Sequence, residues 1–338
     1  MTKKKGVLLV NLGTPDSTKV SDVRKYLREF LMDKRVIDIP AFPRFLLVQG
    51  IIAPFRAPKS AKEYRKLWDE RGSPLKYYTE DITELLGKKL SEEYSVKFAM
   101  RYQNPSIQSV LEEFQKEEVA ELHVIPLFPQ YASATTGSVI DKVMEVTKQW
   151  QIIPAIKFTS QFLEEELFIE TICDQAKTLM AKESYDHFVF SYHGLPERQI
   201  RKGSYGDYCQ LGPCCDTLNE HNRYCYRAQC FETTRLVAAK LDIKEGDYTV
   251  CFQSRLGKDP WVKPYTEDVL KDLVKNGKKK VLAFSPAFVS DCLETTIEVG
   301  LEYHEAFLEA GGEKWDLVPS LNKEDKWVEC LNQLAISN

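Results

Sequence analysis

The chain has 338 residues, of which 43% are hydrophobic and 28% are charged, and its formal net charge is −4. This length allows one or two ordinary hydrophobic cores in a globular protein. The small negative charge, without a long basic run, gives no general attraction to nucleic acid, so we expect no nucleic-acid partner. The amino terminus has too few apolar residues for a signal peptide, and no apolar run is long enough to span a bilayer, so we expect a cytoplasmic protein.

Strands and helices are predicted to alternate along the first half of the chain. A buried strand at 6–10 leads into the loop NLGTPDS, after which Ser17 or Ser21 is placed to cap a helix. Further strands are predicted at 95–102, 121–127 and 152–158, and further helices at 62–68, 79–90, 106–116 and 138–149. The second of these strands ends in the polar residues Arg101 and Tyr102.

Residues 36–55 form an unusually apolar stretch. We expect its three prolines and Gly50 to break any long helix, so the stretch cannot cross a bilayer. Two interpretations remain open from the residues alone. The stretch is either part of the core, or an exposed apolar lip that touches a membrane surface or a flat apolar ligand.

The second half repeats the alternation. Strands are predicted at 188–190, 248–254, 279–284 and 315–319, and helices at 162–182, 228–241 and 264–276, before a terminal helix. This order indicates an α/β fold of two similar Rossmann-like, doubly wound domains, each with a four-stranded parallel sheet, and a cleft between them. We place the first domain at 1–158 with the C-terminal helix 320–338, and the second, which carries an acidic helix at 291–305, at 159–319. No G-x-G-x-x-G or P-loop motif supports a nucleotide cofactor.

One histidine lies where a ligand site is expected. Phe188, Val189 and Phe190 form a short apolar run typical of a buried parallel strand, and the run stops at His193 and Gly194. His193 is therefore predicted at the carboxyl end of a central strand, the edge of an open α/β sheet where ligands bind. A histidine there either takes part in acid–base chemistry or is simply held by a neighbouring group.

A row of carboxylates follows a later strand. Ser290 or Asp291 is placed to cap a helix on which Glu294, Glu298 and Glu302 recur every fourth residue and share one face. Like charges at that spacing cost about 0.2–0.5 kcal/mol per pair in an exposed helix. The row is thus either a solvated face or a site for cations or protons. Burial would raise some of these carboxyl pKa values and keep a proton available near neutrality.

Five of the nine cysteines fall in one short segment with the pattern C-x4-C-C-x9-C-x4-C. They are Cys209, Cys214, Cys215, Cys225 and Cys230. Such spacing suits a tetrahedral sulfur site for zinc or an iron–sulfur cluster, with free thiols as the alternative. Because five cysteines are candidates for four ligand positions, Cys214 and Cys215 compete for one ligand position. The cysteines in apolar runs, which we expect in the core, are Cys173, Cys251 and Cys330.

Six motifs then occur in the order typical of one enzyme family. They are NLGTP, RYQNPS, LFPQYASATTGS, SYHGLPER, CFQSRLG-x-x-PW and FVSDCLETTIEVGLEY. From about Gly6 to Leu321 the chain resembles ferrochelatase, the lyase that inserts ferrous iron into a porphyrin at the end of haem synthesis. The resemblance implies protoporphyrin IX and Fe²⁺ as substrates and protohaem as product, with release of two protons.

The resemblance also implies roles for individual residues. His193 is implied as the base that takes protons from the pyrrole nitrogens, and Glu294 as its acidic partner across the porphyrin plane. Glu298 and Glu302 match a carboxylate path along a locally widened helical turn, to which we add Asp291. The implied porphyrin pocket consists of Leu12, Arg101, Tyr102, Tyr131, Ser133, Arg255 and Trp261.

Three further features follow from the resemblance. The stretch 36–55 matches a pocket lip that associates with the membrane in many members, which implies peripheral membrane contact. The insert 203–230 resembles that of bacterial members carrying a [2Fe–2S] cluster, so we expect that cofactor, with zinc or no metal as alternatives. Arg101 and Tyr102 resemble the branch that uses protoporphyrin rather than coproporphyrin. Cys292 stands where the family often has histidine and is a softer metal ligand.

Two other functions remain to be compared with this one. A chelatase for another tetrapyrrole or metal, such as cobalt, typically presents two histidines against a glutamate, and Cys292 weakens that interpretation. A two-lobed, non-catalytic carrier of iron or haem would bind tightly without turnover.

Overall fold

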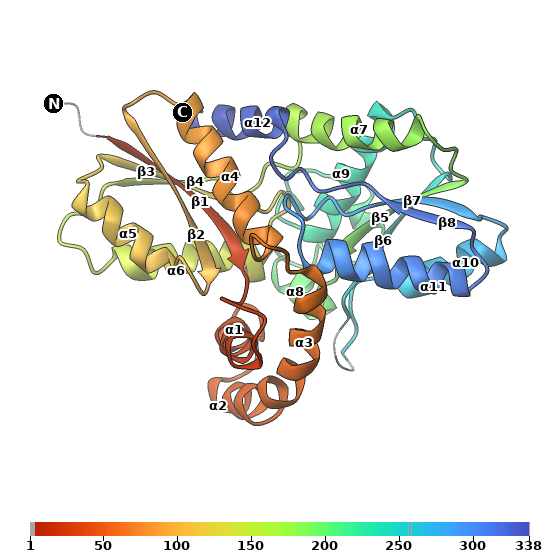
Figure 1. Cartoon of the computed structure of the whole chain (residues 1–338), viewed down its shortest axis with the longest axis horizontal. Coiled ribbons are helices and arrows are strands. Elements are labelled where there is room, and N and C mark those ends of the chain that lie inside the picture. The colour runs from red at the N-terminus through yellow and green to blue at the C-terminus, as the bar shows by residue number, and fades with distance from the viewer. Residues whose placement is uncertain (1–3, 256, 258, 338) are drawn as a thin grey trace. The chain divides into compact units, whose positions relative to one another are not determined.

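Each half of the chain builds its own sheet in the computed structural model, which describes residues 4–255, 257 and 259–337 (Figure 1). The first sheet belongs to a unit made of Met1–Phe128, Ser133–Ser160 and Leu331–Asn338, and the second to a unit made of Pro129–Ala132 and Gln161–Cys330. No helix of the described residues is long and apolar enough to cross a membrane.

The first sheet is parallel throughout and has the order β2-β1-β3-β4. Its strands are β1 (Lys5–Gly13), β2 (Tyr94–Tyr102), β3 (Glu121–Pro126) and β4 (Ala155–Phe158). Val10 of β1 is level with Ala99 on one side and Pro126 on the other. Because β1 is central and covered on both faces, its residues 7–10 form a continuous apolar run that is almost completely buried.

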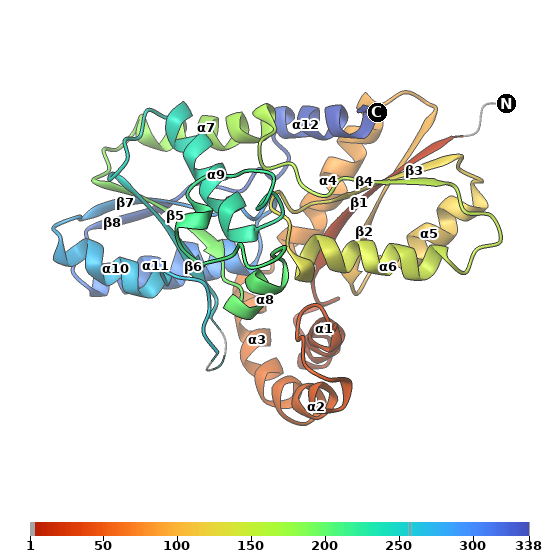
Figure 2. The same cartoon turned by 180° about the vertical axis from the view of Figure 1, so that it is seen from behind.

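Helices cover both faces of this sheet, with α4 on one and α6 on the other (Figures 1 and 2). The helices are α1 (Val20–Met32), α4 (Pro74–Lys89), α5 (Ile107–Lys116) and α6 (Ser138–Thr147). A buried cluster joins the sheet to α5 and α6 through Leu8, Leu111, Phe114 and Val143. The proposed caps of α1 are wrong: the helix begins after Lys19, and the Ser17 hydroxyl instead donates to Asp22.

The expected break of the 36–55 stretch by proline is also wrong, because the chain is helical from 41 to 67. This run consists of α2 (Ala41–Phe45), a π-helical segment (Leu46–Ile52) and α3 (Ala53–Leu67). Pro43 lies in the first turn, where a missing N–H costs nothing. Pro54 is the second residue after the widened segment, where the change of hydrogen-bond register leaves room for a residue without an N–H.

The second sheet is also parallel and has the equivalent order β6-β5-β7-β8. Its strands are β5 (His187–His193), β6 (Tyr248–Gln253), β7 (Lys280–Phe284) and β8 (Lys314–Leu317). In the first sheet β1 lies between β2 and β3, and in the second sheet β5 lies between β6 and β7. The strand order reverses beside that first strand, which is the topological switch point where ligands bind in open α/β sheets.

The second sheet is covered by α7 and α9 on one face and by α10 and α11 on the other (Figures 1 and 2). The helices of this unit are α7 (Glu166–Met180), α8 (Glu197–Lys202), α9 (Tyr226–Lys240), α10 (Thr266–Lys275) and α11 (Tyr303–Glu309). Helix α12 (Asp325–Ile336) ends the chain. Cys173, Cys251 and Cys330 are buried, as predicted. The predicted α/β class with two four-stranded parallel sheets is confirmed.

Candidate active site

His193 is the last residue of β5, at the switch point of the second sheet. Its Nδ1 lies 2.7 Å from the Gly194 carbonyl oxygen. Since a carbonyl oxygen only accepts, Nδ1 must carry the proton of the neutral ring, which leaves the lone pair on Nε2. The His193 carbonyl in turn accepts a hydrogen bond of 2.9 Å from the Tyr226 hydroxyl. The backbone and the ring of His193 are therefore both held in place.

The turn after His193 requires glycine. A Cβ at Gly194 would lie 2.8 Å from the Gln253 carbonyl oxygen and 3.1 Å from the Trp261 ring, too close for any side chain. The Trp261 ring centroid lies 6.5 Å from that of His193. Close approach of these segments thus sets a flat aromatic side chain beside the imidazole.

The carboxylate row lies on a π-helical segment, Leu293–Glu302, in place of an ordinary α-helix. The predicted caps Ser290 and Asp291 are wrong, because Cys292 is the N-cap and forms a capping box with Thr295. Cys292 is buried, and burial raises the pKa of its thiol far above the usual range. A neutral thiol can take part in a helix cap, which explains why cysteine is accommodated at the N-cap of this segment.

The three glutamates of the row have different surroundings. Glu294 and Glu298 are half-buried, whereas Glu302 is exposed. Glu298 accepts hydrogen bonds from the Ser254 hydroxyl at 2.5 Å and from the Tyr303 hydroxyl at 3.0 Å. Burial raises the pKa of Glu298, and the Ser254 hydrogen bond and the charge on His193 oppose this rise. A carboxyl of this kind holds a proton more readily than an exposed one, and it interacts electrostatically with His193.

Tyr303 was missed by sequence analysis. It lies five residues after Glu298, a spacing that brings two side chains together only in a π-helical turn. Burial raises its own pKa far above the usual range, so it remains a hydrogen-bond donor. Gln253, the last residue of β6, links Glu298 at 3.4 Å to the buried Ser191 hydroxyl at 2.6 Å.

Asp291 lies outside this hydrogen-bonded group. Its Oδ2 accepts from the Asn322 side chain at 2.8 Å, and its Oδ1 accepts from the Ser320 backbone N–H at 3.3 Å. Its own backbone N–H donates to the Asn322 side chain at 2.9 Å. These contacts hold the chain before the π-helical segment against the 320–322 loop.

The other predicted residues of this unit are aromatic or cationic. The Arg255 guanidinium is exposed and lies 4.6 Å from the Tyr265 ring centroid. Trp261 is half-buried, and no partner is found for its indole N–H within the described residues. The backbone N–H of Tyr131 donates to Gln229 at 2.6 Å, and its ring packs edge-on against Tyr224.

In the first unit, Arg101 and Tyr102 end β2 and meet a carboxylate that sequence analysis did not single out. Asp33 Oδ2 accepts from Arg101 at 2.6 Å, from Ser138 at 2.5 Å and from Tyr102 at 3.0 Å. Burial alone would raise the pKa of Asp33, but the hydrogen bonds from Ser138 and the Arg35 N–H, together with the Arg101 charge, hold it below its usual value.

The other two predicted residues of the first unit, Ser133 and Leu12, make fewer hydrogen bonds. Ser133 is exposed, and its hydroxyl accepts from Arg35 at 3.1 Å. Leu12 is half-buried near the carboxyl end of β1, where its N–H donates to the Asn11 side chain at 2.8 Å.

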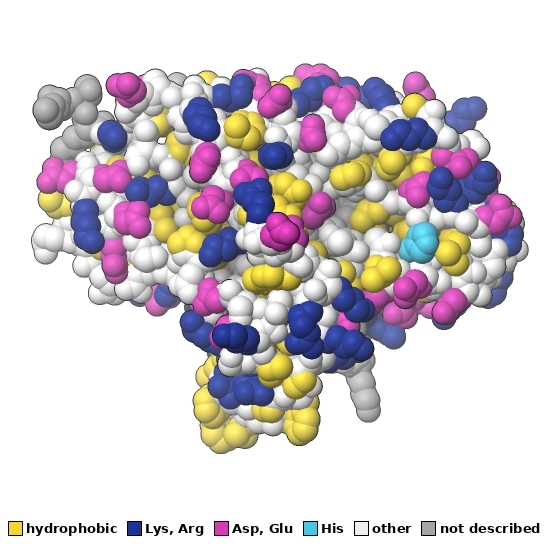
Figure 3. All heavy atoms as spheres, in the orientation of Figure 1, with side chains coloured by type: hydrophobic (Ala, Val, Ile, Leu, Met, Phe, Trp, Pro, Cys, Tyr) yellow, Lys and Arg dark blue, Asp and Glu magenta, His cyan; other side chains and the backbone are white. Residues whose placement is uncertain are grey.

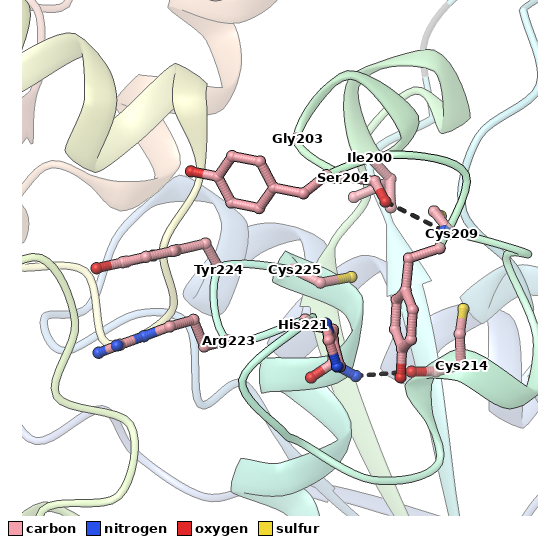
Figure 4. Close-up of a pocket in the computed structure, with 12 residues that line it drawn as sticks. Ile200, Gly203, Ser204, Cys209, Cys214, His221, Arg223, Tyr224 and Cys225 are labelled. Atoms are coloured by element: carbon pink, nitrogen blue, oxygen red, sulfur yellow. Dashed lines mark hydrogen bonds between the residues drawn. The ribbon is translucent and has the colours of Figure 1, made fainter.

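The cysteine insert folds around a cavity of about 20 Å³ lined by Cys209, Cys214 and Cys225 (Figure 4). Asn222 organises the loop by donating to the Cys214 and Thr217 carbonyls at 2.7 and 2.8 Å. These bonds fold a stretch of chain with little regular structure so that its thiols face a common space.

Three of the five thiols in the insert, those of Cys214, Cys215 and Cys225, contact one another in turn. Cys214 and Cys215 are 3.8 Å apart between sulfurs, and Cys215 donates to Cys225. This hydrogen bond is the main cause that lowers the pKa of Cys225. Cys230 is completely buried in α9, and burial raises the pKa of its thiol far above the usual range.

The donor chemistry of the insert fits an iron–sulfur or zinc site. The thiols of Cys214, Cys215 and Cys225 lie in contact, Cys209 lines the adjoining cavity, and the Arg227 guanidinium hydrogen-bonds to Cys215 and would offset the negative charge of metal-bound thiolates. Within residues 4–255, 257 and 259–337, however, no three His, Cys, Asp or Glu side chains are already spaced to hold a metal ion. The cavity itself has room for about one water molecule.

Comparison with solved structures defines the class of protein first. SirB from Bacillus subtilis with Fe³⁺ has a TM-score of 0.53 and 12% identity, over 98% of this chain and 93% of that one. The sirohydrochlorin chelatase SirB from Bacillus subtilis subspecies spizizenii, in complex with cobalt, has a TM-score of 0.52 and 11% identity, over 97% and 92%. The chain therefore has the two-sheet α/β fold of these chelatases.

Sequence comparison then gives the family. The profile of the family described as Ferrochelatase matches residues 4–338. Ferrochelatase from Legionella pneumophila (strain Paris) is 42% identical over 334 residues, which is 98% of each chain. Ferrochelatase from Coxiella burnetii (strain Dugway 5J108-111) is 42% identical over 339 residues, with 98% and 93% covered. The chain belongs to the ferrochelatase family, and the resemblance seen in its motifs is confirmed.

Proposed function

We propose that the chain inserts Fe²⁺ into protoporphyrin IX and releases two protons, with His193 as the base. Membership of the ferrochelatase family supports the reaction. The observation that supports His193 is its fixed tautomer: the Gly194 carbonyl holds the proton on Nδ1 and leaves Nε2 free to accept one. Within the described residues no hydrogen bond is found at Nε2.

The chemistry needs a proton acceptor of this kind. The two inner N–H groups of a porphyrin are weak acids, and both protons must leave before all four nitrogens can bind Fe²⁺. As His193 takes a proton it becomes an imidazolium, whose charge the nearby Glu298 carboxylate stabilises. The two pyrrole N–H bonds break, the resulting porphyrin dianion binds Fe²⁺ through its four nitrogens, and the two positive charges of the metal balance the two protons that leave.

The carboxylates provide a route for those protons and for the metal. Glu298 is half-buried with a raised pKa, and Glu302, one step along the same segment, is exposed to solvent. We assign Glu294, Glu298 and Glu302 to this route, since carboxylate oxygens both relay protons and bind hard divalent cations. We assign Asp291 a positioning role, because both of its oxygens are used in holding the 320–322 loop.

The porphyrin itself needs flat apolar contacts and partners for its two propionate carboxylates. Trp261 and Tyr131 offer aromatic faces, and the exposed Arg255 guanidinium suits a carboxylate. We assign the remaining porphyrin contacts to Leu12, Arg101 and Ser133, positions that match the family's pocket, whereas Tyr102, which also matches it, is fully buried with its hydroxyl on Asp33 and has a supporting role.

An anaerobic assay tests this function. The purified protein, protoporphyrin IX and Fe²⁺ are combined, and loss of porphyrin fluorescence reports metal insertion. We expect catalytic turnover to protohaem, with slower use of coproporphyrin and of Co²⁺. Binding of the porphyrin without metal insertion would contradict the proposal and favour a carrier. Faster use of coproporphyrin or Co²⁺ would contradict its substrate assignment.

We further propose that the cysteine insert holds a [2Fe–2S] cluster, for which Cys209, Cys214, Cys215, Cys225 and Cys230 are the candidate ligands. Support comes from the convergence of thiols and from the Arg227 charge beside them. Binding would deprotonate the thiols and draw the sulfurs together around the metal, in place of the Cys215–Cys225 hydrogen bond.

Spectroscopy of the protein as purified anaerobically tests the cluster. We expect visible sulfide-to-iron charge-transfer bands and about two irons and two sulfides per chain. Cys225→Ser should abolish the bands, whereas Cys173→Ser, a core cysteine distant in sequence, should retain them. Stoichiometric zinc, or a protein without metal, would contradict the proposal.

Finally, we propose that the apolar side chains of 36–55 contact a membrane surface. Phe42 and Phe55 are 71% and 78% exposed, and Phe45, Leu46 and Ile51 are also exposed. Figure 3 shows hydrophobic side chains gathered at the free end of the region formed by α2 and α3, with lysines and arginines beside them. An exposed apolar patch with a basic border is typical of peripheral membrane binding. Phe42→Ser with Phe55→Ser should reduce flotation with lipid vesicles, and unchanged flotation would contradict this contact.

A further inference from the structure

A separate pocket beside α1 is not used by the proposed reaction. It has a volume of about 530 Å³, within the range of small-molecule sites. The polar residues that line it are Ser21, Arg24, Lys25, Arg28, Glu29, Gln49 and Gln103, and Met32 completes the wall. All of them belong to the first unit and lie outside the predicted porphyrin pocket.

The charge of the lining favours an anion. Three cations, Arg24, Lys25 and Arg28, stand against one carboxylate, Glu29, which leaves a balance of two positive charges. Arg24 and Arg28 are four residues apart on α1, a spacing at which like charges repel unless an anion lies between them. Lys25 lies 3.6 Å from Asp16, and Glu29 accepts a hydrogen bond from Gln103, so these two groups are partly neutralised.

Two buried polar atoms in this lining lack partners. The side chain of Gln103 is 4% exposed, and its Nε2 donates to Glu29, but its Oε1 has no hydrogen-bond partner among the described residues. The same holds for Nε of Arg24. An unsatisfied buried polar atom destabilises the protein, so a ligand that supplies the missing partner gains binding free energy.

The backbone of Gln103 also has an unusual conformation. Its φ is 69°, in the left-handed region that residues other than glycine rarely adopt. Such a conformation persists only where surrounding contacts impose it, and it is concentrated at ligand sites. Gln103, with this backbone and a buried amide oxygen, is one of the residues that line the basic pocket.

From the cations together with the free acceptor, we infer that this pocket binds a phosphate ester that carries a free hydroxyl group. The phosphate would pair with Arg24 and Arg28, and the hydroxyl would donate to Gln103 Oε1. Two sources share this chemistry: the headgroup of an anionic glycerolipid and a soluble polyol phosphate. The pocket wall at Gln49 belongs to the segment Leu46–Ile52, which also exposes Leu46 and Ile51, so a lipid source is within reach of the proposed membrane contact.

Flotation with vesicles tests the inference. Phosphatidylcholine vesicles are doped with either phosphatidylglycerol or phosphatidylethanol, which carry the same charge but differ in the headgroup hydroxyls. Long-range electrostatic attraction to the membrane should be equal for the two lipids, whereas binding in the pocket should be stronger for phosphatidylglycerol. Arg24→Gln with Arg28→Gln should weaken binding to phosphatidylglycerol vesicles about 30-fold, from the usual contribution of two arginines near an anionic surface.

A matched control removes the same charge at the same spacing. Lys271→Gln with Lys275→Gln alters two exposed residues four apart on α10 and should leave binding unchanged. Gln103→Asn, which tolerates the left-handed backbone but withdraws the acceptor, should abolish the preference for phosphatidylglycerol while retaining charge-driven binding. Iron insertion in detergent should be unaffected by Arg24→Gln with Arg28→Gln, which separates this inference from the proposed function.

Titration calorimetry with glycerol 3-phosphate distinguishes the two sources. If glycerol 3-phosphate binds the parent protein but not the Arg24→Gln, Arg28→Gln variant, the ligand is a soluble one. A preference for phosphatidylglycerol without such binding would identify a lipid. If the two lipids bind equally and glycerol 3-phosphate does not bind, or if the variant behaves like the Lys271→Gln, Lys275→Gln control, the inference is wrong.

Discussion

The two sheets have the same strand order, yet the side chains at their carboxyl ends are used differently. At the end of β2, Arg101 and Tyr102 are tied to the buried Asp33. At the end of β5, His193 is held through Nδ1 and its backbone carbonyl, while Nε2 has no hydrogen bond within the described residues. Each sheet therefore presents strand ends at its carboxyl edge, and the residues at those ends make one position rigid and the other reactive.

The same difference appears in the carboxylates. Asp33 has a lowered pKa and remains a permanent anion that balances Arg101. Glu298 has a raised pKa, because burial outweighs its hydrogen bonds, so it holds a proton more readily than an exposed carboxylate does. A carboxylate paired with arginine stabilises structure, whereas one placed near a histidine and two hydroxyl donors is suited to proton transfer.

Removal of the reactive group tests this contrast most severely. His193→Ala should lower kcat for iron insertion about 10²- to 10⁴-fold, the usual contribution of a general base, while protoporphyrin binding is retained. Fluorescence titration measures binding and the anaerobic assay measures turnover. Added imidazole should restore part of the rate if the missing group is a base. Near-normal turnover in the variant would remove His193 from the mechanism.

Loss of the structural carboxylate should affect stability instead. Asp33→Asn leaves the half-buried Arg101 without its anion, and we expect a loss of about 3 kcal/mol in the free energy of unfolding at neutral pH, measured by urea denaturation. Since the folded pKa of Asp33 lies below its value of 3.8 in the unfolded chain, its contribution is present above that pH and is lost as the pH falls through the folded pKa. The difference in the free energy of unfolding between the variant and the parent protein should therefore become smaller at acidic pH. A constant difference across that pH range would contradict the assignment.

Tyr303→Phe should sharpen the role of Glu298. Removing the hydroxyl takes away a hydrogen bond that lowers the pKa of Glu298, so that pKa should rise further. If Glu298 acts as an anion, the acid limb of the pH–rate profile should move to higher pH, and kcat at neutral pH should fall about tenfold, as for a hydrogen bond to a charged group. An unshifted profile with normal kcat would mean that Tyr303 only fills space.

Much of this contrast could be read from the sequence. The apolar run that stops at His193 predicted β5, a buried central strand, and the alternation of strands and helices indicated the parallel α/β class. His193 and the glutamate row followed from the same pattern.

What could not be read depends on contacts between distant residues. Asp33 meets Arg101 across 68 positions, and no local pattern marks that pair. The Glu298–Tyr303 contact requires the π-helical register, for which a period of 3.6 residues gives no signal. The helix starts at Val20 and Leu293 were misplaced because several serines and aspartates near each start competed as caps, and tertiary packing decided among them.

The exposed end of the carboxylate row provides the mildest test. Glu302 differs from Glu298 in being open to solvent, where water can take over its role in passing protons on. Glu302→Gln should therefore change kcat by no more than about twofold, the range of an ordinary surface substitution, whereas Glu298→Gln should lower it at least ten times as much. The two variants remove the same charge from the same segment, so burial is the main difference between them. Equal losses would mean that the row acts as one electrostatic unit in which the local surroundings of Glu298 have no special part.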